Sequence, residues 1–269
     1  MRKECVREEC ESLDKRKIIY FEDELRDEFS KTPLEPKSID GNYVYIRRGP
    51  LKRFTRFFWY RIVWKPIAFI YVKLFFRHKV IGKKKLKEYR SQGYFLYGNH
   101  TQDLGDAFMP QFLDSRKGKH VIVDSRNLSI PFIGRLIPSL GGLPVPSDRI
   151  AAKNFLSAIE ELIGRASAII IYPEAHIWPY YTGIRPFKDD SFAYPAKLDV
   201  PAFAFTNTYK RRKRSKRPQI LTYVDGPYFP DATLPLKERR KKLRDQIYSA
   251  MKDRAKLSDI EIIKYLKKT

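Results

Sequence analysis

The chain has 269 residues, of which 43% are hydrophobic, so it is long enough to bury the core of one large domain or two small ones. Its formal net charge of +23 favours an anionic partner, either nucleic acid or an acidic membrane surface. Cysteine and histidine are scarce: Cys5, Cys10, His78, His100, His120 and His176. This set argues against a disulfide framework and a structural zinc site, and we predict no metal and no cofactor. The first residues lack the apolar core of a signal peptide, which indicates an intracellular, reducing compartment.

Residues 1–50 are dense in charge, and over the first 40 positions acidic side chains outnumber basic ones. They show little periodicity and contain Pro33 and Pro36. This pattern predicts a mobile or peripheral extension with one helix around Ile18–Phe29.

Residues 51–77 are rich in large aromatic side chains, interrupted by Arg and Lys. The longest uncharged run, Pro66–Val72, is far shorter than the roughly 18–20 residues that span a bilayer. Pro66 is expected to divide the stretch into two short apolar segments with a basic fringe. Such a pattern suits an amphipathic segment lying in the headgroup region of a membrane. The alternative is an amphipathic helix packed on the core of its own domain; the aromatic density and basic context favour the membrane interpretation.

From residue 78 onward, short apolar runs alternate with helical stretches. The predicted strands are Val80–Ile81, Tyr94–Tyr97, His120–Val123, Leu143–Val145, Ala168–Tyr172, Ala202–Phe205 and Ile220–Val224. The predicted helices are Asp106–Leu113, Pro131–Leu140, Asp148–Gly164 and Leu236–Lys252. The alternation predicts an α/β domain over residues 78–269 with a mixed, mainly parallel sheet covered by helices on both faces. We therefore expect three parts: 1–50, 51–77 and 78–269.

The first turn with chemical potential, Asn99–Asp106, follows the predicted strand Tyr94–Tyr97. In open α/β sheets ligands bind at the carboxyl ends of the strands, and this turn places a histidine and carboxylates there. A carboxylate that reaches the ring of His100 would fix its tautomer and stabilise the imidazolium when the ring takes a proton. The plain alternative is that Asp103 or Asp106 only caps the following helix.

Two further turns follow predicted strands in the same way. The turn Gly141–Arg149 places Arg149 at a helix start, where the helix N-terminus and the guanidinium together would bind an anion. The alternative interpretation is that Ser147 or Asp148 caps the helix and Arg149 is solvated. In Tyr172–His176, Pro173 ends the strand and Glu174 emerges at the sheet edge. Its carboxylate is expected to hydrogen-bond a hydroxyl of a substrate or a backbone amide of the neighbouring turn. His176 is a lesser candidate, more typical of a pocket wall or a surface.

These turns, followed by the strand that Val200-Pro201 opens, resemble in this order the glycerophospholipid acyltransferase (PlsC-like) family, which includes 1-acylglycerol-3-phosphate acyltransferases. The resemblance covers about residues 78–230. It implies transfer of a fatty acyl group from acyl-CoA or acyl-ACP to a lysophospholipid or related lipid hydroxyl. By analogy His100 is the general base and Asp106 its orienting partner, while Asn99, Gly142, Arg149 and Glu174 bind or position the substrate.

The chain departs from the family pattern at two places. The family block has four residues between its His and its Asp; here Gly105 stands at the Asp position, Asp106 is one residue later and Asp103 is closer. Asp106 is preferred because an apolar helix start follows it, and Asp103 stays open. The Glu block lacks the arginine that the family uses for phosphate, and Arg185 or Lys188 are the candidates to replace it.

The run Lys210–Arg217 has seven basic residues in eight and lies between two predicted strands, which predicts an exposed hairpin tip. It favours an anionic membrane surface over nucleic acid, because no nucleic-acid motif accompanies it. The sequence thus predicts an acyltransferase bound as a peripheral or monotopic protein at the cytoplasmic face of the cell membrane. The alternative is a non-catalytic basic protein that binds membrane or nucleic acid on a degenerate acyltransferase scaffold.

Overall fold

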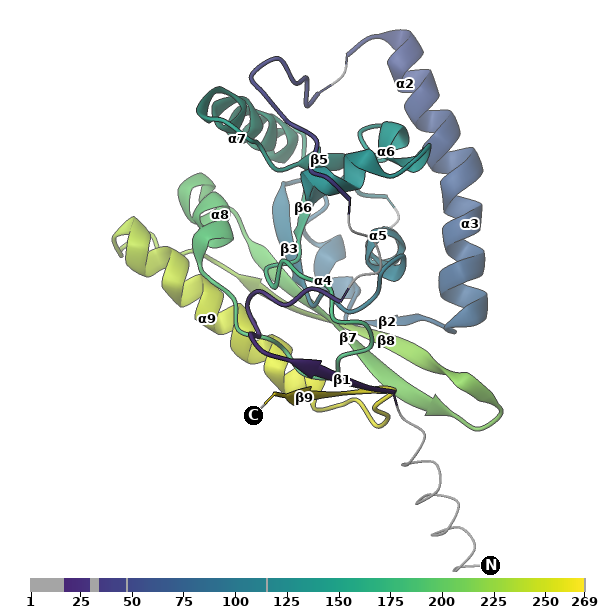
Figure 1. The fold of residues 1–269 in the computed structure, drawn as a ribbon. Helices are drawn as coiled ribbons and strands as arrows, with labels where there is room; N and C mark the ends of the chain where they lie inside the picture. The colour runs from purple at the N-terminus through teal and green to yellow at the C-terminus, as the bar shows by residue number, and fades with distance from the viewer. Residues whose placement is uncertain (1–16, 30–33, 47, 115, 269) are drawn as a thin grey trace, which may run out of the picture.

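A seven-stranded sheet forms the centre of the computed structural model, which describes residues 17–29, 34–46, 48–114 and 116–268 (Figure 1). Its strands are β2 (Lys79–Ile81), β3 (Tyr94–Gly98), β4 (Lys119–Val123), β5 (Gly142–Pro144), β6 (Ala168–Ile171), β7 (Ala202–Arg212) and β8 (Ser215–Tyr228). They lie in the order β2-β8-β7-β3-β6-β4-β5, and only the β7–β8 pair is antiparallel. The mixed, mainly parallel α/β sheet is confirmed.

Helices cover both faces of this sheet. They are α4 (Lys84–Lys87), α5 (Gly105–Phe108), α6 (Ile133–Leu136), α7 (Arg149–Gly164), α8 (Ala193–Leu198) and α9 (Leu236–Ala255), with 3-10 turns at Met109–Phe112, Ser125–Ser129 and Asp190–Phe192. The predicted helix over Asp148–Gly164 is confirmed, and Asp148 caps it by accepting a hydrogen bond from the amide of Ala151 at 2.7 Å. Of the helix predicted over Pro131–Leu140, only the single turn α6 is α-helical in the structure.

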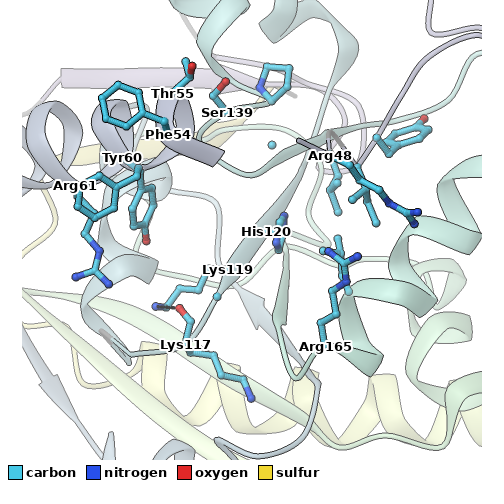
Figure 2. A pocket seen from close by; sticks show the side chains of 18 of the residues that line it. Arg48, Phe54, Thr55, Tyr60, Arg61, Lys117, Lys119, His120, Ser139 and Arg165 are labelled. Carbon is cyan, nitrogen blue, oxygen red and sulfur yellow. Dashed lines mark hydrogen bonds between the residues drawn. The ribbon is translucent and has the colours of Figure 1, made fainter. Parts of the chain in front are cut away.

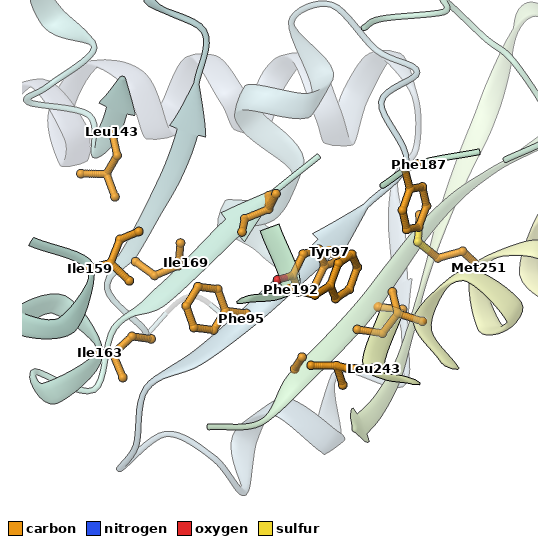
Figure 3. Close-up of a cluster of buried hydrophobic side chains, with 14 of the residues drawn as sticks. Phe95, Tyr97, Leu143, Ile159, Ile163, Ile169, Phe187, Phe192, Leu243 and Met251 are labelled. Carbon is orange, nitrogen blue, oxygen red and sulfur yellow. The ribbon is translucent and has the colours of Figure 1, made fainter. Parts of the chain in front are cut away.

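Alternate residues of the central strands supply two separate cores. Phe95 and Tyr97 of β3 pack with α7 and α9 on one face (Figure 3), while Tyr94 and Leu96 pack on the other face. All four side chains are fully buried. The strand has no polar face, as expected for a parallel strand covered on both sides.

Residues 50–75 form one consecutive helical run at the side of the body: α2 (Pro50–Phe57), a π-helical stretch (Phe58–Trp64), α3 (Lys65–Phe69) and a second π-helical stretch (Ile70–Phe75) (Figure 1). The predicted division at Pro66 is wrong. Pro66 lies in the first turn of α3, and the preceding π-helical register, in which the amide of Lys65 donates to the carbonyl of Tyr60, accommodates a residue without an N–H group.

The inner side of this run packs on the domain, and its outer side does not. Ala68 and Val72 are buried against Phe108 of α5 and Tyr209 of β7. Ten large apolar side chains of the run are exposed: Leu51, Phe54, Phe57, Phe58, Ile62, Ile67, Phe69, Ile70, Leu74 and Phe75. Within the described residues, no helix has the length and apolarity needed to cross a membrane.

The first described residues form a strand rather than the predicted helix. β1 (Lys17–Phe21) pairs in parallel with β9 (Ile263–Lys267) in a separate two-stranded sheet. The prediction of a helix around Ile18–Phe29 is therefore wrong, because β-branched and aromatic residues find a partner strand at the other end of the chain. Where the predicted extension is described it also packs on the body, since Ile39 is buried and Tyr45 contacts Phe155; Cys5 and Cys10 lie outside the described residues.

The basic run lies at the tip of the β7–β8 hairpin, as predicted. Lys213 and Arg214 form its exposed turn. The guanidinium of Arg212 donates to the carbonyl oxygen of Phe75 at 2.8 Å, and that of Arg217 stacks on the Phe75 ring at 4.6 Å. The basic tip therefore lies beside the end of the aromatic helical run.

Candidate active site

The turn between β3 and α5 holds a histidine and an aspartate in direct contact. The Nδ1 atom of His100 lies 2.8 Å from Oδ2 of Asp106, and the amide of Gln102 donates to the same oxygen at 2.9 Å. The side chain of His100 is 17% exposed and that of Asp106 is 2% exposed. Burial raises the pKa of Asp106, and the hydrogen bond from His100 opposes that rise. A buried carboxylate thus holds one ring nitrogen while the imidazole still reaches solvent.

The extra residue before Asp106 is absorbed in the turn. Asp103 is exposed, whereas Asp106 lies in the first turn of α5 and faces the ring. A Cβ atom at Gly105 would lie 2.7 Å from Cβ of Gln102 and 2.9 Å from Cε of Met109, so this position accepts only glycine without a shift of its neighbours. Between the two carboxylates that the sequence leaves open, the geometry selects Asp106.

The end of β6 supplies an aromatic wall for the histidine. The ring of Tyr172 stacks on that of His100, with centroids 4.5 Å apart and planes 17° apart. Its hydroxyl donates to the backbone carbonyl of Asp106 at 2.5 Å. Tyr172 therefore contacts both members of the pair, and only its place at a strand end could have marked it in the sequence.

Glu174 hydrogen-bonds the backbone of the histidine turn and that of Arg185. Its Oε2 atom accepts the backbone N–H of His100 and its Oε1 atom accepts that of Arg185, both at 3.0 Å. The side chain is fully buried, which raises its pKa, and the guanidinium of Arg185 opposes that rise. Of the two expected partners, a substrate hydroxyl or a backbone amide, the structure shows the amide. Direct contact between Glu174 and a substrate is therefore not supported.

Arg185 does not replace the missing phosphate ligand. Its side chain is 1% exposed, lies 3.5 Å from the Glu174 carboxylate, and donates to the carbonyls of His176 and Glu24. It also stacks over the ring of Trp178 at 4.9 Å. The expectation that Arg185 reaches phosphate is wrong, because the N-terminal residues close over it. Lys188 is exposed.

The side chain of Asn99, at the end of β3, forms two hydrogen bonds with the backbone of Asn207 on β7. The side chain of Asn99 donates to the carbonyl of Asn207 at 3.0 Å and accepts its amide at 2.8 Å. Asn99 is 1% exposed, and its polar atoms extend the strand pairing, so its role in substrate binding stays a prediction. The Nδ2 atom of Asn207 in turn lies 3.5 Å from Oδ1 of Asp106.

Arg149 and Gly142 lie away from the pair, and His176 has another carboxylate as its partner. Arg149 is exposed at the start of α7; β5, which precedes it, stands three strand spacings from β3, roughly 14 Å. Gly142 opens β5 at the opposite, amino edge of the sheet, where a Cβ atom would lie 2.2 Å from Cγ2 of Ile137. His176 lies 3.2 Å from the carboxylate of Glu28.

A cavity of about 1150 Å³ lies at this opposite edge, between the helical run and the starts of β4 and β5 (Figure 2). It is lined by cationic side chains: Arg48, Arg61, Arg116, Lys117, Lys119 and Arg165. The amine of Lys117 donates to the carbonyls of Tyr89, Arg90 and Gln92, and that of Lys119 donates to two further carbonyls. Burial lowers the pKa of both lysines to about 8. These amines are bound to backbone.

The pair at the carboxyl edge defines the class of chemistry. Because Asp106 holds Nδ1 of His100, Nε2 is left to accept a proton from a hydroxyl or to return one, which is general acid–base chemistry. Among the residues that the structure describes, no group of His, Cys, Asp and Glu is arranged to hold a metal ion. The domain is thus an α/β scaffold that presents a hydrogen-bonded histidine–aspartate pair at a strand end.

Comparison with known proteins identifies the domain more closely. Residues 77–206 match the sequence model of the family described as Acyltransferase, and this part of the chain belongs to that family. A solved structure of 1-acyl-sn-glycerophosphate (LPA) acyltransferase, PlsC, from Thermotoga maritima is similar, with 15% identity and a TM-score of 0.48 over 76% of this chain and 94% of that one. No curated protein sequence matches the chain.

Proposed function

We propose that this acyltransferase moves a fatty acyl group from an acyl thioester, carried by coenzyme A or acyl carrier protein, to the hydroxyl of a lysophospholipid or related lipid. The hydrogen bond between His100 and Asp106, beside a partly exposed imidazole, carries the proposal. An alcohol is a weak nucleophile at neutral pH, so it requires a base in the transition state.

The proposed steps use only this pair. Nε2 of His100 removes the proton of the acceptor hydroxyl as its oxygen attacks the thioester carbonyl, and Asp106 stabilises the imidazolium. The tetrahedral intermediate collapses, the carbon–sulfur bond breaks, and the imidazolium returns its proton to the leaving thiolate. An ester and a free thiol result.

Arg149 is our candidate for the acceptor phosphate. It is exposed at the N-terminus of α7, a helix of 16 residues whose first turn lies at the carboxyl edge of the sheet. A helix N-terminus and a guanidinium both favour an anion. Because β5 lies three strand spacings from β3, a phosphate bound at Arg149 would belong to an extended substrate such as a lipid.

We further propose that the enzyme binds the cytoplasmic face of the cell membrane as a peripheral or monotopic protein. The ten exposed apolar side chains of the helical run and the neighbouring basic hairpin tip support this. Near an anionic bilayer each basic residue contributes about 1 kcal/mol. Changing Lys213, Arg214 and Lys216 to Gln should weaken binding to phosphatidylglycerol vesicles in co-sedimentation and flatten its salt dependence, with phosphatidylcholine vesicles as the control.

A non-catalytic, membrane- or nucleic-acid-binding protein is the second candidate, favoured by the absence of an exposed arginine in the Glu174 block. The deciding experiment incubates the purified protein with acyl-CoA and acyl-ACP of several chain lengths and a panel of lysophospholipids. Release of thiol with formation of the diacyl lipid supports the enzyme. If no donor and acceptor pair reacts, the non-catalytic candidate stands.

A further inference from the structure

A line of buried polar side chains leads from Asp106 away from the site. Asn207 of β7 lies 3.5 Å from Asp106, the hydroxyl of Thr222 on β8 lies 2.6 Å from Oδ1 of Asn207, and Nε2 of His78 lies 2.7 Å from that hydroxyl. Asn207, Thr222 and His78 are each 2% exposed or less. Asn207 and Thr222 are direct partners in the β7–β8 pairing, so the sheet itself sets their spacing.

The direction of each hydrogen bond follows from the inventory of donors. An ionised Asp106 only accepts, so Asn207 turns its NH2 group toward Asp106 and its oxygen toward Thr222. The single proton of Thr222 is then donated to Asn207, and Thr222 accepts from Nε2–H of His78. Nε2 of His78 therefore carries a proton.

Two independent observations agree with this direction. The Nδ1 atom of His78 is buried and finds no hydrogen-bond partner among the described residues, as expected for the nitrogen without a proton. Burial, reinforced by the amine of Lys73, lowers the pKa of His78 to about 3, so the ring stays neutral at physiological pH.

We propose that Thr222 and Asn207 are positioning residues, which hold Asp106 ionised and oriented so that His100 acts as the base. Every donor in the line points toward Asp106, and hydrogen bonds in such a chain reinforce one another. This inference rests on the proposed function for its catalytic meaning. It adds that Thr222, on a strand two positions from β3 in the sheet, affects how well His100 serves as a base.

The line ends at the helical run. The amide of His78 donates to the carbonyl of Val72 at 3.1 Å, and the amine of Lys73 donates to the carbonyl of His78 at 2.7 Å. The segment proposed to bind the membrane is therefore tied to the residue that begins the line.

The other titratable groups around the pair are identified as follows. Tyr172 and Glu174 face it from the end of β6, Tyr209 from β7 and Tyr71 from the helical run, while Lys73 faces His78. Burial raises the pKa of Tyr172 and Tyr209 well above 10, so they do not titrate below pH 9. Glu174 is paired with Arg185.

The test is a matched set of threonine variants. Thr222→Val removes the hydroxyl at nearly constant volume, and Thr222→Ser restores it. Thr206→Val is the control, because Thr206 is equally buried, on the paired strand β7, and its hydroxyl has no partner among the described residues. The measurements are kcat/KM from pH 5 to 9 and the NMR titration of the His100 ring, assigned with single His→Gln variants.

Thr222→Val should lower kcat about tenfold, leave KM unchanged, and move the acid limb of the profile up by about half a pH unit. The sign follows because Thr222 orients the Asn207 amide that donates to Asp106, and a carboxylate with a less well-placed donor binds a proton more tightly; the pair is then lost as a base at a higher pH. Thr222→Ser and Thr206→Val should keep the wild-type profile. A Thr222→Val enzyme whose His100 titration and acid limb both stay in place would overturn the proposal.

The 15N shifts of His78 give a second readout, independent of turnover. They should show a neutral ring protonated on Nε2 throughout pH 5–9. Protonation on Nδ1 would reverse the line and overturn the proposal. Absence of acyl transfer in the wild type would instead defeat the proposed function, while the NMR measurements would still decide the direction of the line.

Discussion

The two edges of the sheet each gather a histidine among charged side chains, but they use their polar groups differently. At the carboxyl edge, donors from several elements converge on Asp106, and the His100 ring reaches solvent. At the amino edge, the wide cationic cavity of Figure 2 contains His120, which is buried, and two lysines whose amines are bound to backbone carbonyls. The two edges thus differ less in volume and charge than in the hydrogen-bonded, partly exposed imidazole, which only the carboxyl edge presents among the residues compared.

The largest expected difference lies between the two histidines. His100→Gln should lower kcat for acyl transfer by about four orders of magnitude, because it removes the only base in the proposed mechanism. His120→Gln should change kcat by less than about threefold once the folded fraction is matched by circular dichroism. Equal losses in the two variants would erase the distinction between the edges.

Asp106 and Asp103 sharpen the comparison within the carboxyl edge. Asp106→Asn should lower kcat by about two to three orders of magnitude, since a neutral amide neither fixes the tautomer nor stabilises the imidazolium. Asp103→Asn, at an exposed position one turn earlier, should retain nearly full activity. Single-turnover assays at saturating donor measure both, and a larger loss for Asp103→Asn would contradict the geometry.

Lys117 tests whether the cationic cavity is structural. Lys117→Met leaves three backbone carbonyls without their donor and should lower the free energy of unfolding by about 2 kcal/mol in urea titrations. The exposed Lys87→Met should stay within about 0.5 kcal/mol of wild type. The activity of the folded Lys117→Met protein should be unchanged; a specific loss of kcat would place chemistry at the amino edge.

The two ends of α7 offer the smallest contrast. Arg149→Ala, at the carboxyl edge, should raise the acceptor KM about tenfold and leave the donor KM unchanged, as expected for loss of a phosphate contact. Arg165→Ala, just past the other end of the helix, should change neither. Equal rises in both KM values for Arg149→Ala would argue against a phosphate role.

The parts that the sequence predicts well depend on local order. The strands around Tyr94–Tyr97 and Ala168–Tyr172 are recognisable because both of their faces are apolar. The start of α7 is recognisable at Asp148 because helix capping is a local preference of the residue type. The contact between His100 and Asp106 also lies within one turn. Local patterns therefore predict the sheet and the contact between His100 and Asp106.

The parts that it misses depend on neighbours remote in the chain. Asn99 turns inward because Asn207 stands beside it on β7, and Arg185 is buried because Glu24 and its neighbours close over it. Neither contact follows from spacing, since register and side-chain direction are set by tertiary packing. One signal was available: the polar Thr206-Asn207-Thr208 interrupts an otherwise apolar, buried strand.

The pairing of β1 with β9 has a consequence for how the enzyme matures on the ribosome. Tyr265 of β9 stacks on Trp178 at 4.8 Å, and the amide of Trp178 donates to the carbonyl of His100 at 3.1 Å. Translation delivers β9 long after the turn that holds His100, so the contact between Tyr265 and Trp178 forms only when most of the domain has been synthesised.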